Sequence, residues 1–326
     1  MLRKRFINAL LTGVYLAVGF VGVTAPAIAA AAPAVPAPVV QSDSPAMPSL
    51  AAGMPTLDMA AAKTAKGVVA PKGAPNATAH SPAKVLTVCP GGICYEYAGG
   101  KQTVGSDGYA VNVSIENPAI TASDAYHSLA ELAVQDGSGN IVEVGWTKDT
   151  AVCGVSGGPC LFVFNWVGGV AGCYNGCGVV PVTGCGTLCP GASLTSLIGT
   201  TKSFAIQYLP TASPAGWYIA VDGAWRAAIP ETDWTGSGAS FTRGTLNQTF
   251  GELALKNLAP SQCSDMGSGV LATGSPTLLG AKLNSYTLVN GSAAASLTAF
   301  ATTPAKWASF TTASGLSVRY GGPGWC

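Results

Sequence analysis

Short apolar runs separated by turn residues dominate the chain from residue 86 onward. Gly, Asn, Asp or Pro follows most of these runs, and no stretch offers a long helical period. Asp136-Gly137-Ser138-Gly139-Asn140 and Asp222-Gly223 predict hairpin turns between neighbouring runs. Short strands at regular spacing predict an all-β protein, an antiparallel β-sandwich. The runs cover residues 111–115, 130–134, 141–146, 161–166, 204–209 and 217–221.

Residues 1–85 predict two segments that precede the sandwich. Three basic residues, an apolar run to about residue 23 and Ala27-Ile28-Ala29 predict a secretory signal peptide over residues 1–29. An uncleaved membrane anchor is the alternative, but the run falls short of the ~20 apolar residues that a spanning helix needs. Residues 30–85 are rich in Ala and Pro without hydrophobic period, and they predict a disordered linker or a pro-segment. A plain tether is the other interpretation of residues 30–85. The sandwich domain is expected to span residues 86–326.

Ten cysteines agree with export to an oxidising compartment, secreted or at the cell surface. Their even number and close local spacing predict a disulfide framework that staples the loops. Zinc is the alternative for the four central cysteines, whose spacing tolerates it. We expect pairs 89–94, 153–160 and 263–326, with the central four paired among themselves. The cysteines are Cys89, Cys94, Cys153, Cys160, Cys173, Cys177, Cys185, Cys189, Cys263 and Cys326.

Two glutamates stand in apolar strand-like segments of a chain that is only 10% charged. Side chains alternate across a strand, so Glu143 lies opposite the bulky face of its run, and Gly145 beside it leaves room for a ligand. The same alternation places Glu252 with Gln248 on one face of its strand. Both carboxyls could therefore look out of the concave face of one curved sheet. When two such carboxyls face each other, one can keep its proton and act as an acid while the other ionises and acts as a base.

Other chemistries have little support in the composition. The net charge of +1, with Lys and Arg scattered, argues against a nucleic-acid partner. The two histidines are His80, in the linker, and His127, which we interpret as a strand residue with a structural hydrogen bond. A serine triad would have to use His127, and His-rich metal motifs are absent. We therefore expect no metal and no cofactor.

Seven segments, in order from residue 86 to 326, resemble the neprosin family of glutamic peptidases. Ile141-Val142-Glu143-Val144-Gly145-Trp146 resembles the family's IEAGW segment, and residues 248–253 resemble its FGEV segment; these two hold its catalytic glutamates. Residues 172–177 resemble its GCYN…C loop. The remaining matches are residues 109–113, 124–134, 216–230 and 266–269.

The resemblance implies an antiparallel β-sandwich and a secreted acid endopeptidase, monomeric and free of the membrane, that cleaves proline-containing peptides after proline. Glu143 and Glu252 would be its catalytic pair. The folded activation domain of plant members is missing, which leaves the activation mechanism open. A non-catalytic secreted or cell-wall module and a glycoside hydrolase with two carboxylates are the alternatives. Candidate substrate-binding residues are Gln248 and Asn175, as amide donors, and Tyr174, Trp166, Tyr208 and Trp217, as aromatic walls.

Overall fold

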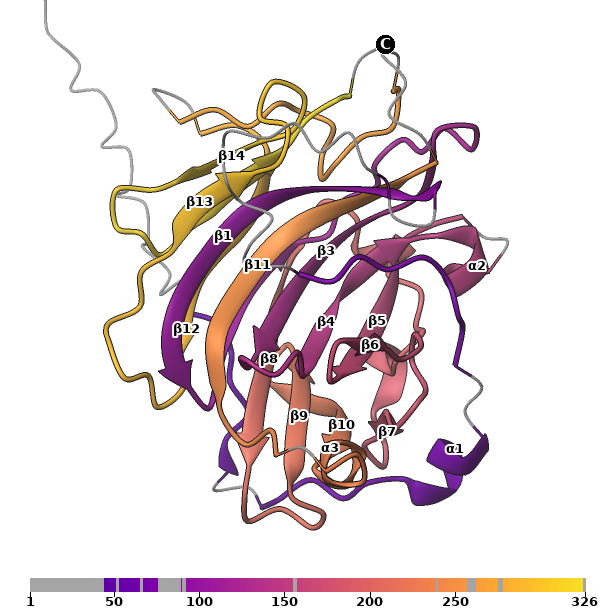
Figure 1. Ribbon diagram of the computed structural model, residues 1–326, viewed down its shortest axis with the longest axis vertical. Coiled ribbons are helices and arrows are strands. Elements are labelled where there is room, and N and C mark those ends of the chain that lie inside the picture. The colour runs from indigo at the N-terminus through magenta and orange to yellow at the C-terminus, as the bar shows by residue number, and fades with distance from the viewer. Residues whose placement is uncertain are drawn as a thin grey trace, which may run out of the picture. The chain divides into compact units, whose positions relative to one another are not determined.

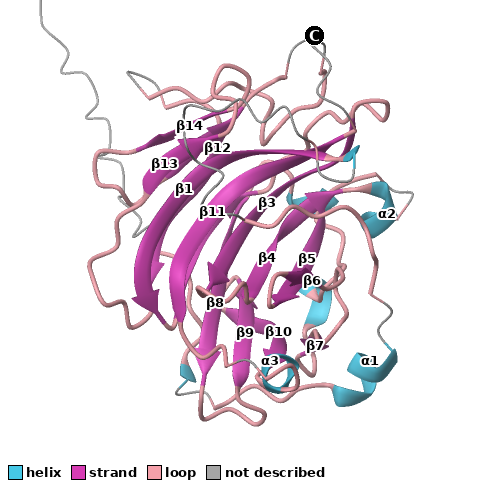
Figure 2. Ribbon diagram, viewed as in Figure 1, coloured by secondary structure: helices cyan, strands magenta, loops and turns pink. Residues whose placement is uncertain are grey.

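Two stacked antiparallel sheets form the body of the protein in a computed structural model (Figures 1 and 2). The seven-stranded sheet has the order β13 (Thr298–Ala301), β1 (Cys94–Ser106), β11 (Gly244–Leu255), β3 (Ala125–Gln135), β4 (Ile141–Lys148), β5 (Cys160–Val167) and β6 (Val170–Ala171). The eight-stranded sheet has the order β14 (Ala308–Thr311), β15 (Val318–Gly321), β12 (Ala281–Leu288), β2 (Gly108–Ser114), β8 (Thr201–Leu209), β9 (Gly216–Val221), β10 (Ala224–Pro230) and β7 (Val180–Pro181). The predicted β-sandwich is confirmed.

Helices are few and short in the part of the chain that the structure describes. They are α1 (Met59–Thr64), α2 (Thr150–Cys153) and α3 (Thr232–Thr235). No helix within the described ranges is long and apolar enough to cross a membrane. The structure describes residues 44–50, 53–64, 67–75, 89, 92–154, 157–238, 240–256, 262–274 and 278–324. The expected signal peptide and Cys326 lie outside these ranges.

The hairpin turns follow from residues that tolerate unusual backbone angles. Asp136 closes the β3–β4 turn by accepting bonds from the amides of Ser138 and Asn140 at 2.8 and 3.0 Å. Between β9 and β10, Asp222 and Gly223 both have positive φ, 50° and 69°. Two consecutive residues of that kind make the tight hairpin turn that matches the twist of the strands.

The core lies between the two sheets and uses one alternating face of each strand. On β3 and β4 the inward side chains include Leu132, Val144 and Trp146, all fully buried. They pack with side chains of β8 and β9, such as Phe204 and Trp217. The same alternation turns Glu131 on β3 and Glu143 on β4 to the outer face of the seven-stranded sheet.

The described disulfides fix loops at the edges of the sheets, as the fold prediction required. Cys153–Cys160 joins α2 to the start of β5, and Cys173–Cys177 closes the loop that carries Tyr174. Cys89–Cys94 and Cys185–Cys189 close two further loops. The central four cysteines thus pair locally, and no free cysteine occurs among the described residues. Cys263 is also disulfide-bonded.

Much of the stretch expected to be disordered is ordered against the sandwich. Leu57 forms an antiparallel bridge with Val182, and the Asp58 amide donates to the carbonyl of Pro181 on β7 at 2.8 Å. Residues 67–75 cross the seven-stranded sheet, where Figure 1 draws them as an indigo chain in front of β11, β3 and β4. The expectation of disorder is corrected for residues 44–50, 53–64 and 67–75. Backbone hydrogen bonds hold this stretch, so a search for hydrophobic period could not detect it.

Candidate active site

Three glutamates from three adjacent strands lie on the outer face of the seven-stranded sheet. Glu131 of β3 is flanked in register by Gly145 of β4 and Phe250 of β11. Glu143 of β4 lies two residues further along the strand direction on one side, and Glu252 of β11 lies two residues further in the opposite direction. The three carboxyls therefore form a diagonal with Glu131 in the middle. All three side chains are fully buried.

The ammonium of Lys72 sits at the point where the three carboxyls converge. Its Nζ lies 3.1 Å from Oε1 of Glu131, 3.2 Å from Oε2 of Glu143 and 3.1 Å from Oε2 of Glu252. Because all three oxygens lie this close to the same nitrogen, no two of them are further apart than about twice the distance to Nζ. One bridging water can span such a separation. The structure thus brings Glu143 and Glu252 together, as expected, and adds Glu131 between them.

Residues 67–75 lie over the carboxyls as an extended peptide. Val68 and Tyr174 exchange two backbone hydrogen bonds, of 3.1 and 2.9 Å, in an antiparallel bridge. Further along, the Tyr174 hydroxyl donates to the carbonyl of Pro71 at 3.2 Å, and the Gly73 amide donates to Oε1 of Glu252 at 3.0 Å. The open groove expected between the two glutamates is therefore covered in this structure by the chain's own N-terminal stretch.

Gly73 is required where the peptide passes closest to β1. A Cβ at this position would lie 2.0 Å from the hydroxyl oxygen of Tyr97 and 2.7 Å from Cδ1 of Tyr95. Neither approach is sterically possible, so a side chain here would push the peptide off the sheet. The Tyr97 hydroxyl also donates to the carbonyl of Ala74 at 3.3 Å. The cover is thus fitted to the site by close backbone approach.

Trp166 holds one oxygen of Glu143. Its indole Nε1 donates to Oε1 at 3.0 Å, while the other oxygen faces Lys72. Burial raises the pKa of Glu143 to about 7, against the opposing effects of the Lys72 ammonium and the indole bond. Burial also raises the pKa of Glu131 well above its ordinary value, and the charge of Glu143 adds to that rise. Both carboxyls therefore keep a proton more readily than an exposed glutamate does.

Glu252 has the opposite tendency. Burial alone would raise its pKa, but the Lys72 ammonium and the bond from His127 outweigh it and lower the pKa of this carboxyl. Nε2 of His127 lies 2.9 Å from Oε1 of Glu252, and Nδ1 faces Oδ2 of Asp149 at 3.6 Å. Burial alone would lower the pKa of His127, yet the nearby carboxylates of Asp149 and Glu252 raise it. The site thus holds one carboxyl that favours ionisation beside two that favour a proton, which is the pattern of an acid–base pair.

Three further predicted residues line the site or support it. Gln248 lies on the outer face of β11 and accepts a bond from the side-chain amide of Gln135. Tyr174 packs edge-on against Phe164, with ring centroids 5.0 Å apart, beside the covering peptide. Asn175 has a supporting role: its Oδ1 accepts the Val163 amide at 2.9 Å. In this structure Asn175 thus makes a structural hydrogen bond to β5.

Two predicted aromatic walls lie elsewhere. Tyr208 on β8 and Trp217 on β9 belong to the eight-stranded sheet and pack in the core between the sheets. The Trp217 indole donates to the carbonyl of Phe241 at 2.7 Å, and the Tyr208 hydroxyl donates to Glu231 at 2.7 Å. An aromatic ring in a strand-like run is as compatible with the core as with a cleft wall. In this structure, both rings lie in the core.

Gly145 has a different role from the one expected from the sequence. A Cβ there would lie 1.9 Å from the carbonyl oxygen of Ala130. The glycine permits close approach of β4 to β3, and it does not leave room for a ligand.

Sequence reasoning missed Lys72, Glu131 and the His127–Asp149 pair. Glu131 could have been found by the criterion applied to the other two, because it too is a lone carboxylate in a strongly apolar run. Lys72 carries no such signal in its Ala- and Pro-rich stretch. The role of His127 depends on Asp149, which approaches it from the start of α2, a relation that spacing along the chain does not reveal.

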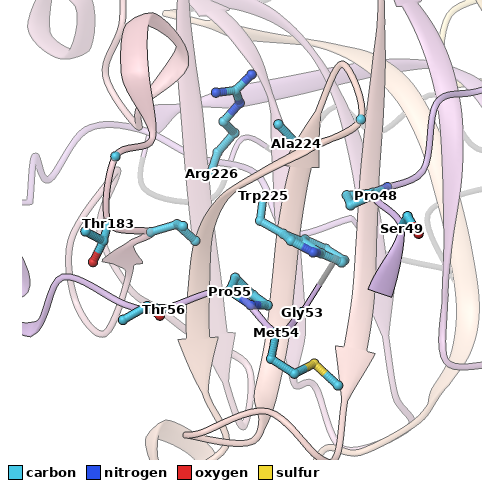
Figure 3. A pocket seen from close by; sticks show the side chains of 13 residues that line it. Pro48, Ser49, Gly53, Met54, Pro55, Thr56, Thr183, Ala224, Trp225 and Arg226 are labelled. Carbon is cyan, nitrogen blue, oxygen red and sulfur yellow. The ribbon is translucent and has the colours of Figure 1, made fainter. Parts of the chain in front are cut away.

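A hollow on the other sheet is separate from the carboxyls. Figure 3 shows it between residues 48–56 and the start of β10, where Met54, Pro55 and Trp225 line it. Its volume is about 650 Å³, and none of the three glutamates contributes to its wall. The peptide of residues 67–75 covers the glutamate site, on the outer face of the seven-stranded sheet.

Comparisons with known proteins give weak structural likenesses. No protein-family model and no curated protein matches the chain. Scytalido-glutamic peptidase, solved with a peptide-based transition state analogue, aligns at 10% identity over 71% of this chain and 99% of that chain, with a TM-score of 0.31. SCP-B, a member of the eqolisin family of peptidases solved with the tripeptide Ala-Ile-His, gives the same values. The Crh5 transglycosylase aligns at 13% identity over 56% of this chain and 74% of that chain, with a TM-score of 0.25. At these TM-scores the likenesses carry no argument about function.

Proposed function

We propose that the protein is the latent form of a secreted glutamic-type endopeptidase that cleaves after proline and uses Glu143 and Glu252 as its carboxyl pair. One observation carries this proposal: an extended stretch of peptide is bound by its backbone directly over a cluster of buried carboxyls. A site that binds nine residues of extended chain in this way is shaped for a peptide. Carboxyls of opposed proton affinity beneath it are the groups that amide hydrolysis needs.

The reaction uses a water molecule held between the two carboxyls. The ionised carboxylate takes a proton from the water as the oxygen bonds to the carbonyl carbon. The protonated carboxyl gives its proton to the amide nitrogen as the C–N bond breaks. The pair then holds one proton again, on the other partner, and exchange with solvent restores the starting state. Glu131 lies between the two and shares their ammonium, so it belongs to the same proton-coupled cluster.

Latency follows from the position of Lys72. Its ammonium occupies the place between Glu143 and Glu252 where the attacking water would have to sit. The ammonium also favours ionisation of Glu143, so it opposes the proton that the acid partner must carry. Residues 67–75 therefore act as a pro-segment that must leave the groove before a substrate can enter.

The covering peptide also supports the preference for proline. Pro71 comes directly before the residue whose side chain reaches the carboxyls, and its carbonyl accepts the Tyr174 hydroxyl. A substrate proline in the same place would lie beside Tyr174, an aromatic ring of the kind on which proline packs well. The expected signal peptide and the disulfides support secretion, because disulfides persist in oxidising compartments.

The test is to incubate the full chain at pH 3 to 5 with a proline-rich peptide and to identify the products by mass spectrometry. We expect cleavage on the carboxyl side of proline after a lag, during which the segment of residues 67–75 is released. Glu143→Gln and Glu252→Gln should each lower the rate at least ~100-fold, since glutamine keeps the size of the side chain but cannot exchange a proton.

Glu96→Gln is the matched control. Glu96 is also a buried glutamate of the seven-stranded sheet, but it accepts bonds from Thr302 and Thr303 and does not touch Lys72. This variant should keep the wild-type rate. A chain that cleaves no peptide at any acid pH, even after the segment has been released, would favour the non-catalytic binding module. Full activity of either site variant would remove that glutamate from the mechanism.

A further inference from the structure

His127 lies behind Glu252, on the side away from the position of the attacking water. It is fully buried, and its Nε2 contacts Oε1 of Glu252, whereas Lys72 contacts the other oxygen. When the pro-segment leaves, Lys72 and the Gly73 amide leave with it. Among the described residues, His127 then provides the positive charge in contact with Glu252. Within the described ranges no equivalent cation touches Glu143, which keeps the neutral indole of Trp166 as a partner.

Asp149 faces the ring of His127 from the opposite side, with 3.6 Å between the two facing atoms. Its Oδ2 faces Nδ1, and its Oδ1 accepts the amide of Ala151 at 2.7 Å as the N-cap of α2. The Cys153–Cys160 disulfide ties this short helix to β5. The cap bond and the disulfide hold the two ends of α2, and Asp149 at its start presents a carboxylate to the ring nitrogen that does not face Glu252. An imidazole between two carboxylates is stabilised with a proton on both nitrogens.

We propose that His127, oriented by Asp149, is the positioning residue that keeps Glu252 ionised as the general base and leaves Glu143 to act as the general acid. This inference rests on the proposed peptidase function and assigns the two roles within it. His127 does not touch the substrate; it orients Glu252 and supplies charge to it. In the reaction, Glu252 accepts a proton from water, and Glu143 then gives its own proton to the leaving nitrogen.

The groups that set the charge of Glu252 come from every element around it. Lys72 lowers its pKa in the latent form, and His127 does so in both forms. Across the same ammonium, the charge of Glu143 opposes ionisation of Glu131, and the charge of Glu252 opposes ionisation of Glu143. Burial, helped by the charge of Glu252, raises the pKa values of three neighbouring tyrosines, so they stay neutral: Tyr95, Tyr97 and Tyr174.

The kinetic test compares pH profiles of the full chain after acid activation. The acid limb of kcat/KM reports the ionisation of the base in the free enzyme. His127→Gln keeps a hydrogen-bond donor but removes the charge, so the acid limb should move to higher pH by about one unit and kcat should fall ~10-fold with little change in KM. Asp149→Asn should move the limb in the same direction by less. A lower rate with an unmoved acid limb would show a merely structural role and overturn the proposal.

Ser128→Ala is the matched control for this series. Ser128 is the next residue on β3 and is equally buried, but its side chain faces away from the outer face that carries His127. Its replacement should leave the acid limb in place. An equal shift in this variant would attribute the effect to general disturbance of β3 and overturn the role of His127.

A second measurement does not need activity. In full chain labelled with ¹⁵N-histidine, His127→Gln and His80→Gln assign the two imidazoles. We expect His127 to carry protons on both nitrogens at pH 6 to 7, and Glu252→Gln to lower its pKa. A neutral ring at pH 6 would overturn the proposal. Should the activated chain cleave no peptide, the proposed function fails, and the imidazole titration alone decides whether the ion pair with Glu252 exists.

Discussion

The two faces of strands β3 and β4 are equally buried and chemically opposite. The inner face carries Leu132, Val144 and Trp146 against the second sheet. The outer face carries Glu131 and Glu143, with 0% exposure of their side chains. Burial on the inner face comes from a second layer of the same sandwich. Burial on the outer face comes from an apolar cluster that includes Phe164, Trp166 and Tyr174, and from the N-terminal stretch that packs on it.

The difference indicates that the inner face stays buried permanently, whereas the cover of the outer face can be removed. An apolar face gains free energy from burial and has no reason to lose its cover. A cluster of buried carboxyls is costly unless it is paired, and Lys72 provides the pairing here. The outer face is therefore stable only as long as one ammonium stays in place. Changes that affect this ammonium should alter the outer face and leave the inner face unchanged.

Lys72→Met should have the largest effect on the outer face. The variant removes the ammonium and leaves the carboxyls buried without a counter-charge, which costs about 3 kcal/mol in comparable sites. The covering peptide should therefore open roughly a hundredfold more often at pH 7. Hydrogen exchange at the Gly73 amide measures this opening directly, because that amide is bonded to Glu252. Peptidase activity of the full chain should also appear with a shorter lag.

Lys202→Met provides the control for this variant. Lys202 pairs with Asp222 at 2.7 Å on the eight-stranded sheet, where both side chains are partly exposed. Such pairs contribute about 0–1 kcal/mol, so exchange at Gly73 should not change. Unchanged exchange in Lys72→Met as well would mean that backbone contacts alone hold the peptide, and the dependence on the ammonium would be wrong.

The pH dependence of stability should show the same contrast with a smaller effect. Burial raises the pKa of Glu143 from 4.5 to about 7, so the folded chain binds a proton that the unfolded chain has lost. The unfolding free energy should therefore fall as pH rises from about 4.5 to about 7, by up to ~1.4 kcal/mol per pH unit for this group. The lowered pKa of Glu252 has the opposite sign, so its contribution is lost below pH 4.5.

Two variants separate these contributions in denaturant titrations at several pH values. Glu143→Gln should flatten the slope on the neutral side, and Glu252→Gln should flatten the slope on the acid side. A core substitution on the inner face lowers stability at every pH and should leave both slopes as they are. If neither glutamine variant changes a slope, the two glutamates do not titrate as their surroundings indicate.

The inner face could be predicted from the sequence, and the outer face could be predicted in part. Alternation along residues 130–134 and 141–146 is a property of neighbours in the chain, so it yields strands, their buried face and the orientation of Glu143. Lys72 reaches the site from 59 residues before its nearest partner in sequence, Glu131. The Asp149–His127 contact likewise depends on where α2 begins beside β3. Contacts of this kind are decided by packing in three dimensions, and no local pattern encodes them.

The smallest expected effect concerns the hydroxyl of Tyr174. This hydroxyl donates to the Pro71 carbonyl, and a single neutral hydrogen bond contributes about 0.5–1.5 kcal/mol. Tyr174→Phe should therefore raise hydrogen exchange at the Val68 amide by roughly threefold to tenfold, because that amide bonds the Tyr174 carbonyl in the same bridge. The ring packing against Phe164 is retained in phenylalanine, so the fold of the loop should be preserved.

Tyr218→Phe is an unusually close control for this last comparison. The Tyr218 hydroxyl also donates to a proline carbonyl, that of Pro214 at 2.8 Å, but it does so on the eight-stranded sheet. It should lose a bond of the same kind without changing exchange at Val68. If the two variants alter that exchange equally, the effect reflects global stability, because a bond on the far sheet cannot act on residues 67–75 in any other way. If only Tyr174→Phe alters it, the outer face opens independently of the sandwich, as a removable cover must.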